Sequence, residues 1–295
     1  MRRAADLSRL EGPGVPPFRL SMDFKLGGLV SGPAEGHYLW ISGPQNQWRR
    51  EISFSGYSEV EVGRGTKVWR ERNIEFTPQS AFWIQSLLSN YDRLVLDEHE
   101  KVDSVYRRSD LQCVTLRGDS DSRDLCFDRS GTLRHVVYPD EMTAYSYSDY
   151  TKFGEKLFPR SLIVSAHGRL VVKATASLTE FDQGSYLGPF EPPPGIVGMS
   201  GCMNPTPSRL VKKVEPRYTY LARGQGRHGS VYLTIHIAAD GTVRNIRVLG
   251  TAGPDLDDAA VDAVRAWKYS PFLCGGVPVE GEEGVTVNFS RAQTH

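Results

Sequence analysis

The sequence predicts an α+β protein with an N-terminal antiparallel open β half-barrel, a helix that covers it, and a small C-terminal α+β domain. Many short runs before residue 180 alternate apolar and polar residues, which is typical of antiparallel strands. Apolar residues at helical spacing occur instead near residues 77–91 and 254–268. Because residues 183–209 are rich in Pro and Gly, we expect a linker there between domains at 1–182 and 210–295.

The charge balance and the hydropathy argue against two classes of protein. The chain of 295 residues carries 35 basic and 35 acidic side chains, so it lacks the basic excess of a nucleic-acid-binding protein. No stretch approaches the roughly 20 apolar residues of a membrane span. Residues 1–14 lack the apolar core of a signal peptide, and an export signal or anchor could have been trimmed from this chain. We therefore expect no nucleic-acid partner and no membrane span in this chain.

Residues 18–26 form the clearest strand of the first domain. Five of its apolar side chains share one face, namely Phe18, Leu20, Met22, Phe24 and Leu26. Thr77 suits the N-cap of the covering helix and Pro78 its first position. The apolar stripe of that helix contains Trp83, Ile84, Leu87, Leu88 and Tyr91. We expect Trp83, Ile84 and Leu87 to face the five strand residues. An open space between them would be an apolar ligand cavity, whereas a filled space would make the domain a structural module.

Strand-like runs continue through residues 94–178, which favours one curved sheet or an open barrel. The runs GHYLWISGPQNQWRREISFSGY and SYSDYTKFGEKLFPRSLIV resemble periplasmic lipoprotein carriers of the LolA/LolB type over about residues 15–182. This resemblance implies a carrier of lipid or of another apolar ligand, and we transfer no ligand residue from it. Four tyrosines fit either a ligand groove or the rim of a sheet: Tyr138, Tyr145, Tyr147 and Tyr150.

The four cysteines form no CxxC pair, which argues against zinc and thioredoxin-type sites. Cys113 and Cys126 lie in neighbouring strand-like runs across the polar turn GDSDSRD, so we expect a disulfide across this hairpin. Cys202 precedes the C-terminal domain and Cys274 follows its helix, so a second disulfide could join the linker to that domain. The alternative is four free thiols in a reducing compartment.

Residues 211–290 indicate a self-contained α+β unit. Residues 230–237 alternate, Asp240-Gly241 signals a hairpin turn, and apolar residues return from Val243. A helix with one apolar stripe follows, at Leu256, Ala259, Ala260, Ala263, Val264 and Trp267. In the last strand we expect three side chains to pack on this helix, those of Val285, Val287 and Phe289. The alternate residues Thr286 and Asn288 should face away.

The sequence pattern of this unit is defined by the following residues, in this order: Pro216, Tyr218, Ala222-Arg223, Gly226, Gly229, Val231, Asp240-Gly241, Val243, Leu256-Asp257, Ala259-Ala260, Val264, Trp267, Tyr269, Pro271 and Pro278-Val279. Together they resemble the C-terminal domain of TonB-family energy transducers. Thr219 stands where that family usually has proline, so the first short helix could start differently. The resemblance implies that a partner peptide adds to a sheet edge, which we assign to Val285, Thr286, Val287, Asn288 and Phe289.

Two short motifs, one typical of dinucleotide binding and one of hydrolases, lack the structural context that their chemistry needs. Gly224, Gly226 and Gly229 spell GxGxxG, but a strand follows them instead of a phosphate-binding helix. Residues 198–202 approach a nucleophile elbow, but Cys202 replaces its second glycine within a linker. The histidines have no ligand spacing. We therefore expect no enzyme activity, no cofactor and no metal site.

Two functions of different classes remain. The first is a non-enzymatic, exported periplasmic protein whose C-terminal domain binds an outer-membrane transporter or another envelope protein, with a link to transport across the outer membrane. The second is a periplasmic carrier that shelters a lipid or acyl ligand in the N-terminal half-barrel. The short linker and the missing anchor count against active force transmission by this chain.

Overall fold

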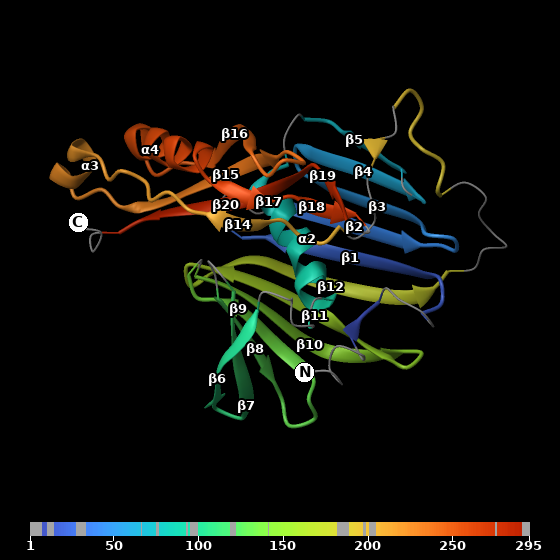
Figure 1. The fold of residues 1–295 in the computed structure, drawn as a ribbon. Helices are drawn as coiled ribbons and strands as arrows, with labels where there is room; N and C mark the ends of the chain where they lie inside the picture. Colours follow the sequence, from blue (N-terminus) through green and yellow to red (C-terminus); the bar gives the residue numbers. More distant parts are fainter. Residues whose placement is uncertain are drawn as a thin grey trace. The chain divides into compact units, whose positions relative to one another are not determined.

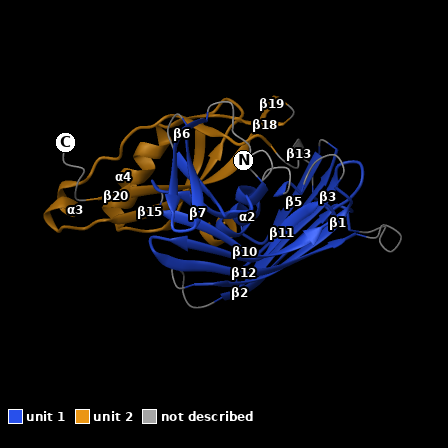
Figure 2. Ribbon diagram, turned by 90° about the horizontal axis from the view of Figure 1, so that it is seen from below, with its two compact units in different colours: residues 1–74, 83–203 blue, residues 75–82, 204–295 orange. Residues whose placement is uncertain are grey.

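The computed structural model describes residues 8–10, 15–27, 34–65, 67–74, 77–92, 94, 100–118, 122–140, 142–181, 189–196, 199–200, 205–274 and 276–290. The chain divides into two compact units (Figure 2), one from residues 1–74 and 83–203 and the other from residues 75–82 and 204–295. Each unit has its own antiparallel sheet, which confirms the predicted α+β class.

The first unit is built on one 13-stranded sheet with the order β13-β5-β4-β3-β2-β1-β12-β11-β10-β9-β8-β7-β6 (Figure 1). β1 pairs with β2 on one side and with β12 on the other, so two runs of hairpins meet at β1. The strands are β1 (Phe18–Leu26), β2 (Ala34–Ser42), β3 (Gln47–Phe54), β4 (Tyr57–Arg64), β5 (Lys67–Arg72), β6 (Lys101–Arg108), β7 (Leu111–Arg117), β8 (Ser122–Phe127), β9 (Leu133–Tyr138), β10 (Thr143–Phe153), β11 (Lys156–Ala166), β12 (Arg169–Glu180) and β13 (Met199–Ser200).

The helix α2 (Gln79–Asp92) lies against one face of this sheet, which we name the inner face. Tyr147 of β10 donates a hydrogen bond to the Leu87 carbonyl oxygen at 2.9 Å, and Gln85 donates to Glu59 of β4 at 3.2 Å. The register links Glu59 through Ile52 and Tyr38 to Met22, and directly opposed residues share a face. The apolar side of β1 therefore points to the inner face, as its alternation predicts.

The segment expected to be a linker contains structured residues within the first unit. Phe190 packs on Leu39 and Ile41 of β2, on the face opposite to α2. Glu191 pairs with Arg64 at 2.8 Å, and β13 pairs with β5. The sequence alone did not indicate these contacts because the residues that Phe190 covers lie about 150 positions earlier in the chain.

The second unit centres on β15 (Gly229–Ile237), the middle strand of the sheet β16-β15-β20. Its other elements are β14 (Arg209–Lys212), α3 (Tyr220–Gly224), β16 (Val243–Gly250), α4 (Pro254–Arg265), β17 (Lys268–Ser270), β18 (Phe272–Cys274), β19 (Val277–Val279) and β20 (Gly281–Phe289). The predicted stripe residues Leu256, Ala260, Val264 and Trp267 join the core of this unit. At the predicted hairpin turn, Gly241 has φ +75°, and a Cβ there would lie 1.9 Å from the Tyr269 carbonyl oxygen, so only glycine fits.

Helix α3 explains how the chain accommodates Thr219 in place of the family's usual proline. Thr219 is the N-cap of α3, and its side chain accepts a hydrogen bond from the Ala222 N–H at 3.1 Å. The side-chain acceptor of Thr219 thus starts the helix at a position where proline would do so through its fixed φ angle. Among the described residues, no helix has the length and apolar character needed to cross a membrane.

Candidate functional site: the edge strand of the C-terminal unit

β20 forms one edge of the three-stranded sheet. It pairs with β15 over nine consecutive positions, from Gly229 opposite Phe289 to Ile237 opposite Gly281, without a register shift. The described sheet has no strand beyond β20. The other edge strand, β16, shifts register twice against β15 and contains Asn245 at φ +46°. Because irregular edges are poor templates for further pairing, β20 is the better acceptor of a new strand.

The two faces of β20 have different surroundings. Val285, Val287 and Phe289 are 8%, 4% and 3% exposed and belong to the core cluster with Leu256 and Trp267. Thr286 and Asn288 lie on the opposite face and are half-buried. Ser230 of β15 donates a hydrogen bond to Asn288 at 2.7 Å. The inward side chains anchor the strand, so its backbone is held in an extended conformation.

The first half of β20 has further neighbours within the second unit. Glu282 accepts a hydrogen bond from Thr77 at 3.2 Å, and Glu283 accepts one from Ser208. The Phe82 ring would lie 3.2 Å from a Cβ at Gly284. These contacts involve residues 281–284. The stretch assigned to partner binding, Val285–Phe289, takes no part in them. Sequence reasoning missed them because Thr77 and Phe82 are about 200 positions away.

The corner between α3 and α4 lies beside the end of β20. The Tyr218 ring packs on Phe289 with centroids 6.0 Å apart, and the Arg223 guanidinium lies 5.7 Å above Tyr218. Arg227 forms an ion pair with Asp255 at 2.7 Å. The hydrogen bond from Thr219, followed by Arg227, holds the pKa of Asp255 below its ordinary value despite some desolvation. This network fixes the local backbone around the candidate edge.

The eight residues assigned to an apolar cavity are all buried in the structure. They are Phe18, Leu20, Met22, Phe24, Leu26, Trp83, Ile84 and Leu87. Aromatic rings fill part of the inner face, since the Phe18 ring lies 5.0 Å from Trp40 and 6.4 Å from Phe153. The tyrosines also have packing roles, because Tyr145 and Tyr147 are buried and Tyr138 donates to Asn90 at 2.6 Å. A hollow of 610 Å³ is lined by residues that include Asp128, Arg134 and His135, and none of the eight residues lines it.

The inner face of β3–β5 carries charged side chains that alternation alone did not reveal. Arg50, Glu61 and Arg70 stand directly opposite one another on three adjacent strands. Arg70 donates to Glu61 at 2.7 Å, and the Arg50 guanidinium lies 4.6 Å above Trp40 and 4.9 Å above Trp48. This half of the inner face is therefore not a uniform apolar wall.

Two glutamates of β4 respond to this environment in opposite directions. Burial alone would raise the pKa of Glu61, but Arg70 and Arg50 outweigh it and hold that pKa below its ordinary value. Burial raises the pKa of Glu59, and the neighbouring Glu61 charge raises it further. Tyr57 and Gln85 donate hydrogen bonds to Glu59 at 3.0 and 3.2 Å. Finding this pair from the sequence would have required the strand register.

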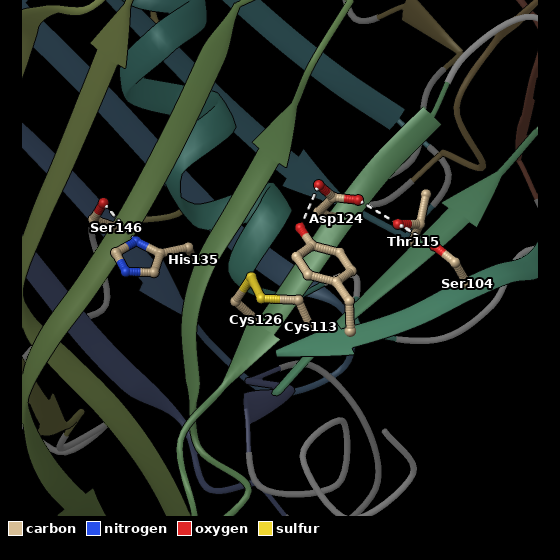
Figure 3. The surroundings of a disulfide bond; sticks show 8 residues. Ser104, Cys113, Thr115, Asp124, Cys126, His135 and Ser146 are labelled. Atoms are coloured by element: carbon tan, nitrogen blue, oxygen red, sulfur yellow. Dashed lines mark hydrogen bonds between the residues drawn. A yellow bond between two sulfur atoms is a disulfide. The ribbon is translucent and has the colours of Figure 1, made fainter. Parts of the chain in front are cut away.

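The predicted disulfide between Cys113 and Cys126 is confirmed, and it joins directly opposed positions of β7 and β8 (Figure 3). His135 stands opposite Cys126 in β9 and hydrogen-bonds Ser146 at 2.9 Å. Cys274 has a free, half-buried thiol, whereas Cys202 lies outside the described residues, so the second pairing stays a prediction. No group of three or more potential metal ligands occurs among the side chains that the structure describes.

Residues 214–290 match the protein family described as Gram-negative bacterial TonB protein C-terminal. This C-terminal segment is TonB-like. It is 33% identical over 84 residues to the protein TonB of Vibrio cholerae serotype O1, which covers 28% of this chain and 34% of that protein. It is 37% identical over 76 residues to the protein TonB of Xanthomonas campestris pv. campestris, again over 34% of the relative. The protein tonB2 of Pseudomonas aeruginosa is 36% identical over 75 residues. The chain thus spans about a third of the length of these relatives.

The solved structures similar to this chain include a LolA superfamily protein, NE2245 from Nitrosomonas europaea. It has a TM-score of 0.42 and 13% identity, and it covers 61% of this chain and 91% of its own. A putative outer membrane lipoprotein-sorting protein domain from Vibrio parahaemolyticus has a TM-score of 0.41 and 10% identity, over 63% and 92% of the two chains.

Proposed function

We propose that this chain is a non-enzymatic protein of the cell envelope whose TonB-like unit binds an extended segment of a partner protein by strand addition. The observation that carries the proposal is the regular, nine-residue edge strand β20, whose inner side chains are anchored in the core. The partner segment would pair with Val285–Phe289. The partner class is an outer-membrane transporter or another envelope protein, and the similarity of residues 214–290 to TonB proteins supports this class.

Strand addition suits this edge for a physical reason. A row of backbone N–H and C=O groups supplies affinity for any extended segment, while the side chains along the edge select among segments. Thr286 and Asn288 offer small polar groups beside that row. Because the core holds β20 in an extended conformation, β20 itself loses little conformational entropy when the partner segment binds.

The proposed location is the periplasm, and the function is linked to transport across the outer membrane. The Cys113–Cys126 disulfide supports this compartment, because disulfides persist in oxidising environments such as the periplasm. The TonB-like segment points to the same cell envelope. No catalytic step is needed for strand addition.

Disulfide trapping tests the register of the proposed complex. Cysteine is introduced on β20 as Thr286→Cys or Asn288→Cys, and on the other edge strand as the matched control Arg244→Cys, each in a C202S/C274S background. A TonB-box-like extended peptide with one cysteine should cross-link to β20 and not to β16. Equal trapping on both strands, or trapping on β16 alone, would reject this edge as the binding site.

A further inference from the structure

The strand at the far end of the large sheet, β6 (Lys101–Arg108), is exposed along its whole length (Figure 1). It pairs with β7, and the described sheet has no strand beyond it. The other end of the sheet differs, because β13 pairs with part of β5 and covers that edge. Exposed edge strands present unpaired backbone groups and are the usual places where another strand adds.

A β-bulge places apolar side chains of β6 on one face. Val102 stands opposite Leu116 and Val105 opposite Val114, with a register shift between Val102 and Ser104 that adds Asp103 to the strand. Val102 and Val105 therefore share the face of Leu116 although they are three residues apart. Leu116 is fully buried, while the two valines are 50% and 57% exposed. Apolar surface thus continues from the core to the open edge.

Side-chain bonds on the opposite face hold β6 in its extended form. Ser104 donates to Thr115 at 3.0 Å, and Tyr106 donates to Asp124 at 2.8 Å. On the same face, the disulfide joins β7 to β8 (Figure 3). An edge that is already extended loses little conformational entropy when a further strand pairs with it.

The charge of β6 selects among possible occupants. The strand contains three basic residues, Lys101, Arg107 and Arg108. Its one acidic residue, Asp103, forms an ion pair with Arg117 at 3.2 Å. Antiparallel pairing of two copies about the strand centre would place Lys101 opposite Arg108, and like charges directly opposite each other are destabilising. The same charges attract a segment with acidic side chains.

We propose that β6 is a second strand-addition edge, which accepts an extended segment of a partner protein with acidic and apolar side chains at alternate positions. The apolar side chains would cover Val102 and Val105, and the acidic ones would lie on the other face of the sheet, beside Lys101 and Arg108. This site is separate from β20, and it does not depend on the function proposed for the TonB-like unit.

The test uses the full chain and two labelled eight-residue peptides with capped ends, one alternating Val and Glu and the other alternating Val and Lys. Fluorescence polarisation should detect binding of the acidic peptide, weakened by added salt. Amide exchange should slow across residues 101–108 and remain unchanged across 281–289. The variant K101E/R108E should bind the acidic peptide about tenfold more weakly, which is within the range of two exposed ion pairs, and should prefer the basic peptide.

Three results would overturn the proposal: equal binding of the two peptides, protection confined to β20, or a concentration-dependent dimer that protects β6. The last would assign the edge to a second copy of the chain. If circular dichroism shows that K101E/R108E is unfolded, K101A/R108A replaces it and should lose affinity for the acidic peptide without gaining any for the basic one. Unchanged affinity in a folded K101A/R108A variant would equally reject the site.

Discussion

Thr219 donates a hydrogen bond to Asp255 at 2.6 Å, and its oxygen also accepts the N–H of Ala222 at 3.1 Å. One hydroxyl group thus caps α3 and joins it to the first turn of α4. The backbone at Thr219 has φ −68°, which is the angle that proline would impose. The helix can therefore start at position 219 either with a side-chain cap or with the fixed φ angle of proline.

Removing this hydroxyl group should destabilise the TonB-like unit. Thr219→Val loses the cap and should cost about 1 kcal/mol in the free energy of unfolding. Thr219→Ser keeps the hydroxyl and is the matched control. Thr219→Pro should lose less than Thr219→Val, because proline restricts the unfolded chain at a compatible φ. Denaturant unfolding followed by tryptophan fluorescence ranks the stabilities of these three variants. A Thr219→Val variant as stable as the wild type would contradict the predicted role of the hydroxyl group.

The buried charges of β4 predict opposite effects of two similar substitutions. Glu61→Gln removes the buried carboxylate that faces Arg70 and Arg50 and should cost about 2 kcal/mol at pH 7. Glu59→Gln should cost less, because the neutral side chain matches the form that burial favours. Urea unfolding of both variants at pH 7 makes the comparison. Equal costs would contradict the assigned charge pattern.

The same pattern predicts the pH dependence of the Glu61 contribution. The folded-state pKa of Glu61 lies below its ordinary value of 4.5, so the carboxylate stabilises the fold above pH 4.5. This contribution is lost as the pH falls through the folded-state pKa. The stability difference between wild type and Glu61→Gln should therefore shrink on acidification. If the stability difference between wild type and Glu61→Gln instead grows below pH 4.5, the direction assigned to the Glu61 pKa shift is wrong.

The disulfide of the first unit predicts a loss of stability on its removal. Cys113 and Cys126 are 13 positions apart, and closing a loop of this size contributes about 3 kcal/mol in the chain-entropy description. The double variant C113A/C126A should therefore lower the denaturation midpoint. Peptide mapping without reduction shows which cysteines are linked, and it also tests the Cys202–Cys274 pairing. Free Cys113 and Cys126 thiols in protein recovered from the periplasm would contradict the assignment.

The carrier hypothesis makes a separate prediction. Because the eight candidate cavity residues are buried among protein atoms, we expect the full chain to take up no fluorescent fatty acid. Native mass spectrometry of freshly isolated protein should likewise show no bound lipid. Saturable uptake that is abolished by Leu87→Trp would favour the carrier instead.

The sequence predicted those features that depend on local periodicity. The alternation of β1 and β20 and the stripe of α4 each follow from residues that are neighbours along the chain. The Cys113–Cys126 pair was also visible, because a short turn makes its two strands adjacent. In each case the interacting residues are close in sequence, so pattern and contact coincide.

Features that depend on register or on distant segments could not be predicted. The row Arg50, Glu61 and Arg70 emerges only when three strands are aligned. The bulge at Asp103 turns Val102 and Val105 to one face, which simple alternation would have separated. Phe190 covers β2 from a segment whose Pro and Gly content indicated only a linker. These contacts follow from tertiary packing, which a single sequence does not reveal.

The proposed partner site is the edge of β20 at Val285–Phe289. Its most direct test is amide hydrogen exchange of the full chain with and without a saturating TonB-box-like extended peptide. We expect slower exchange across residues 285–289 in the complex, with β16 unchanged. Bound peptide with unaltered exchange across 285–289 would contradict it.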